Sequence, residues 1–342
     1  MMPKIKVAII GVGNVASALV QSTHSKKLPG LWRKRVGGYN FSDVEIVAAF
    51  DVDKRKIGLE LSEAIFRAPN VGQKFAKVPS TKVVVKTGIV KDTPPAHIAD
   101  STVGTDTIVE HLKESGASIA LNLIPSGMPK TSVAYAKQCV EAGVSFVNAT
   151  PSLVATKADL QRKFKKAKLV LVGDDLMSQF GGTAFHKGIL DFINSRGIKI
   201  EKSYQLDVGG GNETLNTISE DVKIEKRDIK TEAVAAEVPY KFATVAGTTD
   251  YVDYMGDNRT SYFWISAKGV FDSNVEIDVY LRTNDGANAV NVLLDVIRAV
   301  SYSKKRKQFG TPSEICNYGF KKLARPVLLH SAQAEFNKKY VK

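Results

Sequence analysis

Short apolar runs alternate with segments whose apolar positions repeat at helical spacing in the first half of the chain. Residues 5–10 are predicted to form a buried strand, and residues 14–24 a helix with an apolar stripe. A second helix is expected over 130–143, with Gly143 as its end. Further strands are expected at 44–53, 118–127, 144–151 and 168–176. Strands that alternate with helices predict a parallel sheet with crossover connections.

The pattern changes after about residue 197, where apolar and polar residues alternate. Three antiparallel strands, each with one apolar face, are expected at 199–212, 261–271 and 275–285. A long helix with an apolar stripe follows over 287–305. The predicted fold class is therefore α/β, with a largely antiparallel open sheet inserted before a helical C-terminal return.

The chain has 342 residues, which favours two domains. We expect one domain at 1–197, completed by 286–342, and a sheet domain at 198–285.

The composition favours a cytoplasmic protein. Two cysteines, Cys139 and Cys316, cannot form a disulfide framework, and neither a membrane span nor a signal-peptide core is present in the sequence. The formal net charge of +13 fits either a nucleic-acid partner or lysines gathered around an anionic small molecule. Because the lysines are spread along the chain, and their densest clusters lack aromatic neighbours, we expect neither a nucleic-acid nor a membrane partner.

A candidate nucleotide cradle lies at the N-terminus, in VAIIGVGNVASALVQ (7–21). Gly11 permits a tight turn from strand to helix, and Gly13 permits close approach of a pyrophosphate to the helix N-terminus. Small residues stand where a third glycine is usual. Asp51, at the end of the second strand, would accept bonds from ribose hydroxyls and repel a 2′-phosphate, which favours NAD over NADP.

The distance from Gly11 to Asp51 is longer than the usual ~20 residues, so the loop at 28–43 is interpreted as an insertion. The alternative is a glycine-rich turn without a ligand.

Further candidate positions each have a structural alternative. Asp174 and Asp175 could serve a site or cap a helix, and GGGN (209–212) could approach a ligand or form an irregular hairpin turn. Lys226 and Lys230 would share one helix face, which suits a phosphate or an oxyanion, but a solvated charged helix is favoured on sequence alone. No cluster has metal-ligand spacing, and we interpret His186 as a packed helical histidine.

In their order along the chain, these stretches resemble the inositol-3-phosphate synthase family, in its short archaeal and actinobacterial form. The resemblance rests on GVGNVASALVQ, AAFDVD, AGVSFVNATP, VGDDLMSQ, QLDVGGGNETLN, KRDIKTEAV, YMGDNRTSY, NDGANAVNVLLDVIRA and YGFKK. It implies an NAD-binding Rossmann domain and a sheet domain that carries catalytic residues and forms a homotetramer. It also implies conversion of glucose 6-phosphate to an inositol phosphate, for inositol and phospholipid biosynthesis.

The reaction that the resemblance implies oxidises C5, enolises C6, closes a C6–C1 bond and reduces the ketone with the same NADH. Because negative charge develops on several oxygens, we expect several cations and few carboxylates in the site. By resemblance, the catalytic residues are Lys226, Lys230, Lys321, Arg259, Asp285 and Asp175. The implied NAD shell is Gly11, Gly13, Asn14, Val15, Asp51, Asn122, Thr150, Asp174, Ser178 and Asn212. A cation near the substrate phosphate would leave little trace in the sequence.

Two positions depart from the family pattern, which has lysine where this chain has Met177 and Arg259. Arginine keeps the charge but does not substitute freely for a lysine that transfers a proton. Lys322 is the alternative to Lys321 if the register differs. A family member with another sugar phosphate, an NAD oxidoreductase with net hydride transfer and a nucleic-acid-associated protein remain as alternatives.

Overall fold

A parallel sheet of six strands forms the first layer of the molecule, in a computed structural model that describes residues 3–98 and 107–341. The strand order is β3-β2-β1-β4-β5-β6. The strands are β1 (Ile5–Ile10), β2 (Val44–Asp51), β3 (Val85–Thr87), β4 (Ile119–Asn122), β5 (Ser145–Asn148) and β6 (Leu171–Val172). Because the order reverses between β2 and β4 on either side of β1, a crevice opens at the carboxyl ends of β1 and β4.

Helices cover both faces of this sheet, and β1 shows why. Val7 and Ile9 point into one apolar core, whereas Ala8 and Ile10 point into the other. The first core contains α1 (Asn14–His24) and α9 (Asp285–Lys305), and the second contains α3 (Ile108–Ser115), α4 (Pro129–Ala142) and α5 (Ala158–Lys166). Helix α9, which follows the last strand of the chain, therefore returns to the N-terminal sheet, as the apolar pattern predicted.

The loop between α1 and β2 receives the C-terminal segment. Nη1 of Arg33 lies 2.7 Å from Oδ2 of Asp295 on α9, and both side chains are buried. The amide of Gly37 donates to the carbonyl of Tyr340 over 2.7 Å. The remaining helical elements of the first layer are η1 (Phe41–Asp43), α2 (Leu61–Ala64), α10 (Ser313–Gly319) and α11 (Leu329–Tyr340). The predicted insertion thus seats α9 and α11 on the first layer.

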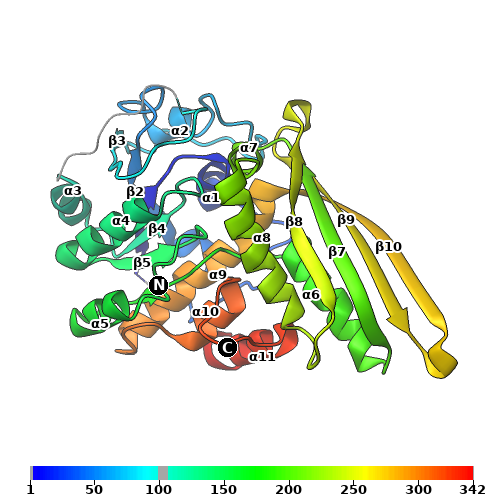
Figure 1. Cartoon of the computed structure of the whole chain (residues 1–342). Coiled ribbons are helices and arrows are strands. Elements are labelled where there is room, and N and C mark those ends of the chain that lie inside the picture. Colours follow the sequence, from blue (N-terminus) through cyan, green and yellow to red (C-terminus); the bar gives the residue numbers. More distant parts are fainter. Residues whose placement is uncertain (1–2, 99–106, 342) are drawn as a thin grey trace.

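A second sheet of four strands stands beside the first layer (Figure 1), in the order β10-β9-β7-β8. Its strands are β7 (Lys199–Gly209), β8 (Ala243–Tyr251), β9 (Asn258–Lys268) and β10 (Asn274–Asn284). The three predicted antiparallel strands are β7, β9 and β10, and their register confirms the pairing. The sequence prediction missed β8, which pairs in parallel with β7 and makes the sheet mixed.

Two helices cover one face of the second sheet, namely α6 (Gly182–Ser195) and α8 (Glu220–Ala235) (Figure 1). Leu190 of α6, Val234 of α8 and Ile265 of β9 belong to one apolar core. The short helix α7 (Asn212–Thr217) and α8 form the crossover from β7 to the parallel strand β8. Two short helical turns complete the layer, η2 (Asp253–Met255) and η3 (Val270–Asp272). The domain bounds at 197/198 and 285/286 stay a prediction.

No helix among the described residues is long and apolar enough to span a bilayer.

Candidate active site

One cavity joins the two layers at the carboxyl ends of β1, β2 and β4. Both candidate sites of the sequence contribute to its wall. The lining residues that carry the argument are Gly11, Gly13, Asn14, Val15, Asp51, Lys56, Ser126, Thr150, Asp175, Ser178, Asn212, Glu213, Lys226, Lys230, Asp257, Arg259, Asp285 and Lys321. The second sheet thus brings its cations to the glycine-rich turn of the first sheet.

The turn after β1 has the properties of a pyrophosphate cradle. Gly11 has a φ of +92°, and a Cβ there would lie 2.7 Å from the carbonyl oxygen of Leu123. At Gly13, by contrast, a Cβ would meet no atom within 4 Å, so the backbone borders open space. Gly13 is also the N-cap of α1 and offers no side-chain cap, so the first amides of the helix can serve an anion.

Asp51 joins the end of β2 to this turn. Its Oδ2 accepts from the amide of Val12 over 2.7 Å. Its Oδ1 accepts from the amides of Val52, over 2.7 Å, and Asp53, over 2.9 Å. A carboxylate has about four acceptor positions. Since three are used, one position of Oδ2 stays available to a ribose hydroxyl.

Lys56 is a residue of this cradle that sequence reasoning missed. Its Nζ donates to the carbonyl of Val12 over 2.7 Å and to Oδ1 of Asn70 over 2.8 Å. Burial lowers the pKa of Lys56, while the carboxylates of Asp51 and Asp53 oppose that shift. The signal in the sequence was the lysine five positions after Asp51, in DVDKRK.

Other residues of the implied NAD shell divide into a lining group and a supporting group. Asn14, Val15, Thr150, Ser178 and Asn212 line the cavity. Asn122 and Asp174 do not belong to its wall, and both are fully buried. Their role in cofactor binding therefore remains a prediction, and it would be exerted through other residues rather than by direct contact.

The two supporting residues act through Asn148. Nδ2 of Asn122 donates to Oδ1 of Asn148, and Nδ2 of Asn148 donates to Oδ1 of Asp174, each over 2.8 Å. Asp174 also accepts from the amides of Val154 and Ala155, each over 2.9 Å. Burial nevertheless raises the pKa of Asp174. This chain of contacts orders the ends of β4 and β5 behind the cavity.

Lys226 and Lys230 lie on one face of α8, as their spacing predicted, but the favoured interpretation of a solvated helix is wrong at these positions. Both lysines are buried, because this face of α8 packs toward the cavity between the two layers. Nζ of Lys226 lies 2.5 Å from Oε1 of Glu213, and Nζ of Lys230 lies 2.6 Å from Oδ2 of Asp207. Burial lowers the pKa of Lys230 to about 8, although Asp207 opposes the shift.

Arg259 and Asp285 meet at the junction of β9 and α9. Nε of Arg259 donates to Oδ2 of Asp285 over 2.8 Å. Its Nη1 lies 3.5 Å from Oδ2 of Asp207, and its Nη2 lies 3.3 Å from Oγ1 of Thr214. Asp285 therefore holds the guanidinium of Arg259 in place.

Lys321 and Asp175 form a further ion pair at the cavity wall. The side chains pair at 2.7 Å, and the Lys321 amide donates to the Asp175 carbonyl over 2.8 Å. Asp175 has a φ of 62°, a left-handed conformation that aspartate tolerates better than most residues. Lys322 instead pairs with Glu232 on the exposed surface of α8. The register thus favours Lys321 as the lysine of the site.

The expected shortage of carboxylates is wrong. The basic residues of the wall are Lys56, Lys226, Lys230, Arg259 and Lys321, and the acidic ones are Asp51, Asp53, Asp175, Glu213, Asp257 and Asp285. Buried cations need partners to offset their desolvation, and the chain supplies a carboxylate for each lysine and arginine of the second site. A substrate anion would compete with these carboxylates for the cations.

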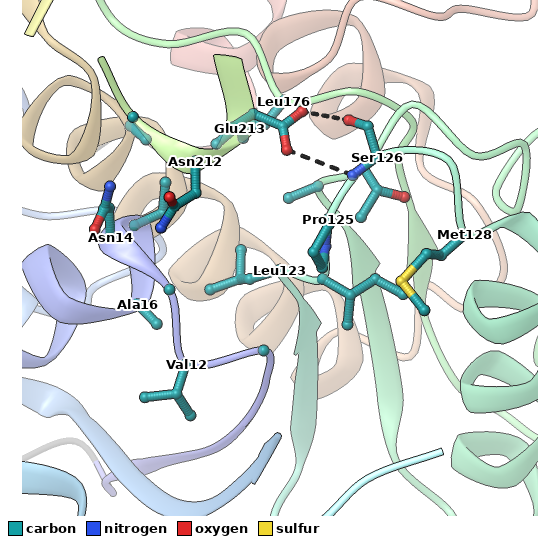
Figure 2. A pocket seen from close by; sticks show the side chains of 18 of the residues that line it. Val12, Asn14, Ala16, Leu123, Pro125, Ser126, Met128, Leu176, Asn212 and Glu213 are labelled. Atoms are coloured by element: carbon teal, nitrogen blue, oxygen red, sulfur yellow. Dashed lines mark hydrogen bonds between the residues drawn. The ribbon is translucent and has the colours of Figure 1, made fainter. Parts of the chain in front are cut away.

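Glu213 links the two layers across the cavity and was not among the predicted residues. Figure 2 shows it pointing at Ser126 in the loop after β4, where it accepts from both the hydroxyl and the amide of Ser126. Desolvation by itself would raise the pKa of Glu213, but the ammonium of Lys226 together with the hydroxyl and amide of Ser126 outweighs it, so the pKa lies below its ordinary value. Its position directly after GGGN was the available signal.

Asp257, in the stretch GDNR, was also missed. Its Oδ2 accepts from the amide of Gly286 at the start of α9 over 2.9 Å. Burial, and then the neighbouring charge of Asp285, raise the pKa of Asp257 to about 6.

The glycines of GGGN serve different purposes. A Cβ on Gly210 would lie 2.6 Å from the backbone of Val252 and Gly256, so this glycine permits close approach of the chain to itself. Gly211 lines the cavity and is the N-cap of α7. The hairpin interpretation is therefore wrong, and ligand approach is confined to the end of the run.

Met177 and His186 both lie outside the cavity wall. Met177 is 6% exposed and is not part of the cavity wall. His186 is buried on α6 with its Nε2 3.0 Å from the hydroxyl of Ser203, as a packed helical histidine should be. The family departure at Met177 therefore removes no cation from this cavity wall.

Comparison with known proteins finds relatives both by sequence and by structure. Residues 181–286 match the family described as Myo-inositol-1-phosphate synthase. Inositol-3-phosphate synthase of Mycobacterium tuberculosis is 33% identical over 317 residues, which are 89% of this chain and 86% of that protein. The enzyme of the same name from Mycolicibacterium smegmatis is 34% identical over 321 residues, with 89% and 88% coverage. The crystal structure of Ari2 superposes with a TM-score of 0.79 at 29% identity, covering 98% of each chain.

Proposed function

This chain belongs to the inositol-3-phosphate synthase family, and we propose that it converts D-glucose 6-phosphate to 1D-myo-inositol 3-phosphate, with NAD as an internally recycled oxidant. The observation that carries the proposal is the convergence of Lys226, Lys230, Arg259 and Lys321 on the cavity that also contains the glycine-rich turn. The overall reaction is an isomerisation, because the hydride removed from C5 returns to C5.

The residues at the N-terminal turn fit NAD. The uncapped amides of α1 and the open space at Gly13 suit a pyrophosphate, and the remaining acceptor position of Asp51 suits a ribose hydroxyl. When bound there, NAD would supply hydride acceptance at C5 and hydride return in the last step. Asn14, Val15, Thr150, Ser178 and Asn212 would complete its shell from the cavity wall.

The cations of the second layer suit the charge that develops during cyclisation. The C5 ketone, its enolate and the C1 oxygen each gain negative charge, which preorganised ammonium and guanidinium groups stabilise in a site shielded from water. Lys226 and Lys230 would hold substrate oxygens and phosphate as point charges, whereas Arg259 would offer a planar fork. Lys321 would approach the reacting carbon chain, with Asp175 as its partner.

The test is incubation of the full chain with NAD and D-glucose 6-phosphate. We expect an inositol phosphate by phosphorus NMR, with no net increase in absorbance from NADH. A steady increase in NADH would instead indicate an oxidoreductase with net hydride transfer. If glucose 6-phosphate is unchanged but another hexose 6-phosphate is cyclised, the substrate assignment is wrong and the reaction class is retained.

We further propose a cytoplasmic homotetramer whose product enters inositol and phospholipid biosynthesis. Support for assembly comes from the second sheet, where Tyr262 and Tyr280 pack ring to ring at 4.8 Å and Tyr280 is 65% exposed. Light scattering at several protein concentrations tests the oligomeric state. A cation near the substrate phosphate is also proposed, and its test is the dependence of the rate on added K⁺, NH₄⁺ and Mg²⁺ after treatment with a chelator.

A further inference from the structure

We infer that Asp207 is a positioning residue, whose buried carboxylate keeps Lys230 protonated and directs both Lys230 and Arg259 toward the substrate. The inference rests on the proposed function for the identity of the substrate, but the arrangement of charges does not depend on it. Asp207 itself is 1% exposed and does not belong to the cavity wall.

The geometry makes Asp207 the shared partner of two cations from different elements. Its Oδ2 lies 2.6 Å from Nζ of Lys230 on α8 and 3.5 Å from Nη1 of Arg259 on β9. Its Oδ1 accepts from the hydroxyl of Ser261 over 2.6 Å and from Nε2 of Gln205 over 2.9 Å. The carboxylate therefore uses all of its acceptor capacity, and its orientation is fixed by β7 and β9.

The charge balance around Lys230 explains why this partner is needed. Burial and the neighbouring cations Arg259 on β9, Lys226 on α8 and Lys321 after α10 all lower the pKa of Lys230, and Asp207 is the charge that opposes them. The pKa of Lys230 stands at about 8 with Asp207 in place. Burial raises the pKa of Asp207, but Lys230 and Arg259 outweigh this, so Asp207 stays ionised at neutral pH.

The first test measures the protonation of Lys230 without turnover. Trace acetylation with acetic anhydride across pH 6–10, followed by peptide mass spectrometry, reports the fraction of Lys230 that is unprotonated. In Asp207→Asn, the midpoint should fall by about one to three pH units, because an opposite charge at this distance has been removed. A midpoint within 0.3 units of the wild-type value (a threshold on the order of the method's precision) would overturn the inference.

Two variants separate charge from local disturbance. Ser261→Ala removes one hydrogen bond to Asp207 and leaves every charge in place, so the Lys230 midpoint should not move. Asp207→Glu keeps the charge, so its midpoint should stay closer to the wild-type value than that of Asp207→Asn. A Ser261→Ala shift as large as that of Asp207→Asn would show that packing, and not charge, controls Lys230. If Asp207→Asn does not fold, the inference still fails where Ser261→Ala or Asp207→Glu lowers the Lys230 midpoint by more than about one pH unit, since both variants keep the carboxylate.

The second test uses activity, and its failure is separable from failure of the proposed function. Asp207→Asn should lower kcat more than it raises KM, and the alkaline limb of its pH profile should move to lower pH by the same amount as the labelling midpoint. Lowering the pH should then restore part of the rate, which a purely structural defect would not allow. If wild type makes no inositol phosphate, the labelling test still stands.

Discussion

Nζ of Lys321 lies 2.7 Å from Oδ1 of Asp175, although 146 positions separate the two residues. The contact joins the segment after α10 to the loop that follows β6, at the wall of the cavity. It places a C-terminal lysine in the site that begins with the N-terminal glycine turn.

Lys321→Met should therefore abolish most of the activity while the protein stays folded. We expect a loss in kcat of about 10²–10³-fold, the usual effect of removing one group that stabilises a developing oxyanion. The matched control is Lys322→Met, since Lys322 pairs with Glu232 at the exposed surface of α8. Equal losses in the two variants would contradict the assignment of Lys321. The measurement is the rate of inositol phosphate formation.

The two glycines of the N-terminal turn should fail in different ways. Gly11→Ala forces a side chain into a φ of +92° and against the Leu123 carbonyl, so the free energy of unfolding should fall by at least about 1–2 kcal/mol. Gly13→Ala meets no protein atom, so stability should be retained while the Kd for NAD rises at least about tenfold. Thermal unfolding and calorimetric titration with NAD measure the two effects. Loss of stability in Gly13→Ala would contradict the open cradle.

Arg259→Lys should be a poor replacement. The guanidinium contacts Asp285, Asp207 and Thr214 at the same time, and an ammonium group cannot reproduce that fork. We expect kcat to fall by roughly 10- to 100-fold. Arg282→Lys, at an exposed position of β10, is the matched control and should retain the wild-type rate. Wild-type kinetics in Arg259→Lys would show that the fork has no role.

The raised pKa of Asp257 predicts that the stability of the fold depends on pH. Its pKa is raised to about 6, so the folded chain binds more protons than the unfolded chain between about pH 4 and 6. Stability therefore decreases as pH rises through this window, and the cost is fully present above about pH 6, at about 3 kcal/mol.

Asp257→Asn removes that cost while keeping an acceptor for the Gly286 amide. Urea unfolding at pH 4.5 and 7.5 should show the variant gaining stability over wild type as the pH rises. Asp228→Asn, at an exposed position of α8, is the control and should show no such trend. If the difference in free energy of unfolding between Asp257→Asn and wild type is the same at the two pH values, the raised pKa of Asp257 is contradicted.

Met177→Lys restores the lysine of the family pattern at a buried position outside the cavity wall. An ammonium group without a partner should destabilise the fold by about 3–5 kcal/mol and should not raise the rate. Met177→Leu conserves volume and should cost less than about 1.5 kcal/mol. Thermal unfolding and the rate of product formation provide the two readouts. A faster enzyme after Met177→Lys would show that the departure limits the chemistry.

The local sequence was sufficient to predict the helices and strands whose apolar positions are periodic. The apolar runs of β1 and β2, the stripe of α9 and the alternation in β7, β9 and β10 each follow from which faces must be buried. The turn at Gly11 and the acid at Asp51 were likewise readable, because their spacing relative to a strand carries the chemistry. The strand β8 escaped prediction, since its pairing with β7 depends on a crossover through α8.

The tertiary structure decided what the charged residues do. The sequence established Lys226 and Lys230 as neighbours on a helix. Only the tertiary position of α8, which turns this face toward the cavity between the two layers, makes the two lysines buried and paired. Asp207, Glu213 and Asp257 gave no periodic signal, because a carboxylate finds its cation through contacts between distant segments. The sequence by itself therefore determined the family, the glycine turn after the first strand and the candidate cations. The fold decided which charged groups are buried next to one another. Their desolvation, together with the ion pairs that they form, sets their pKa values.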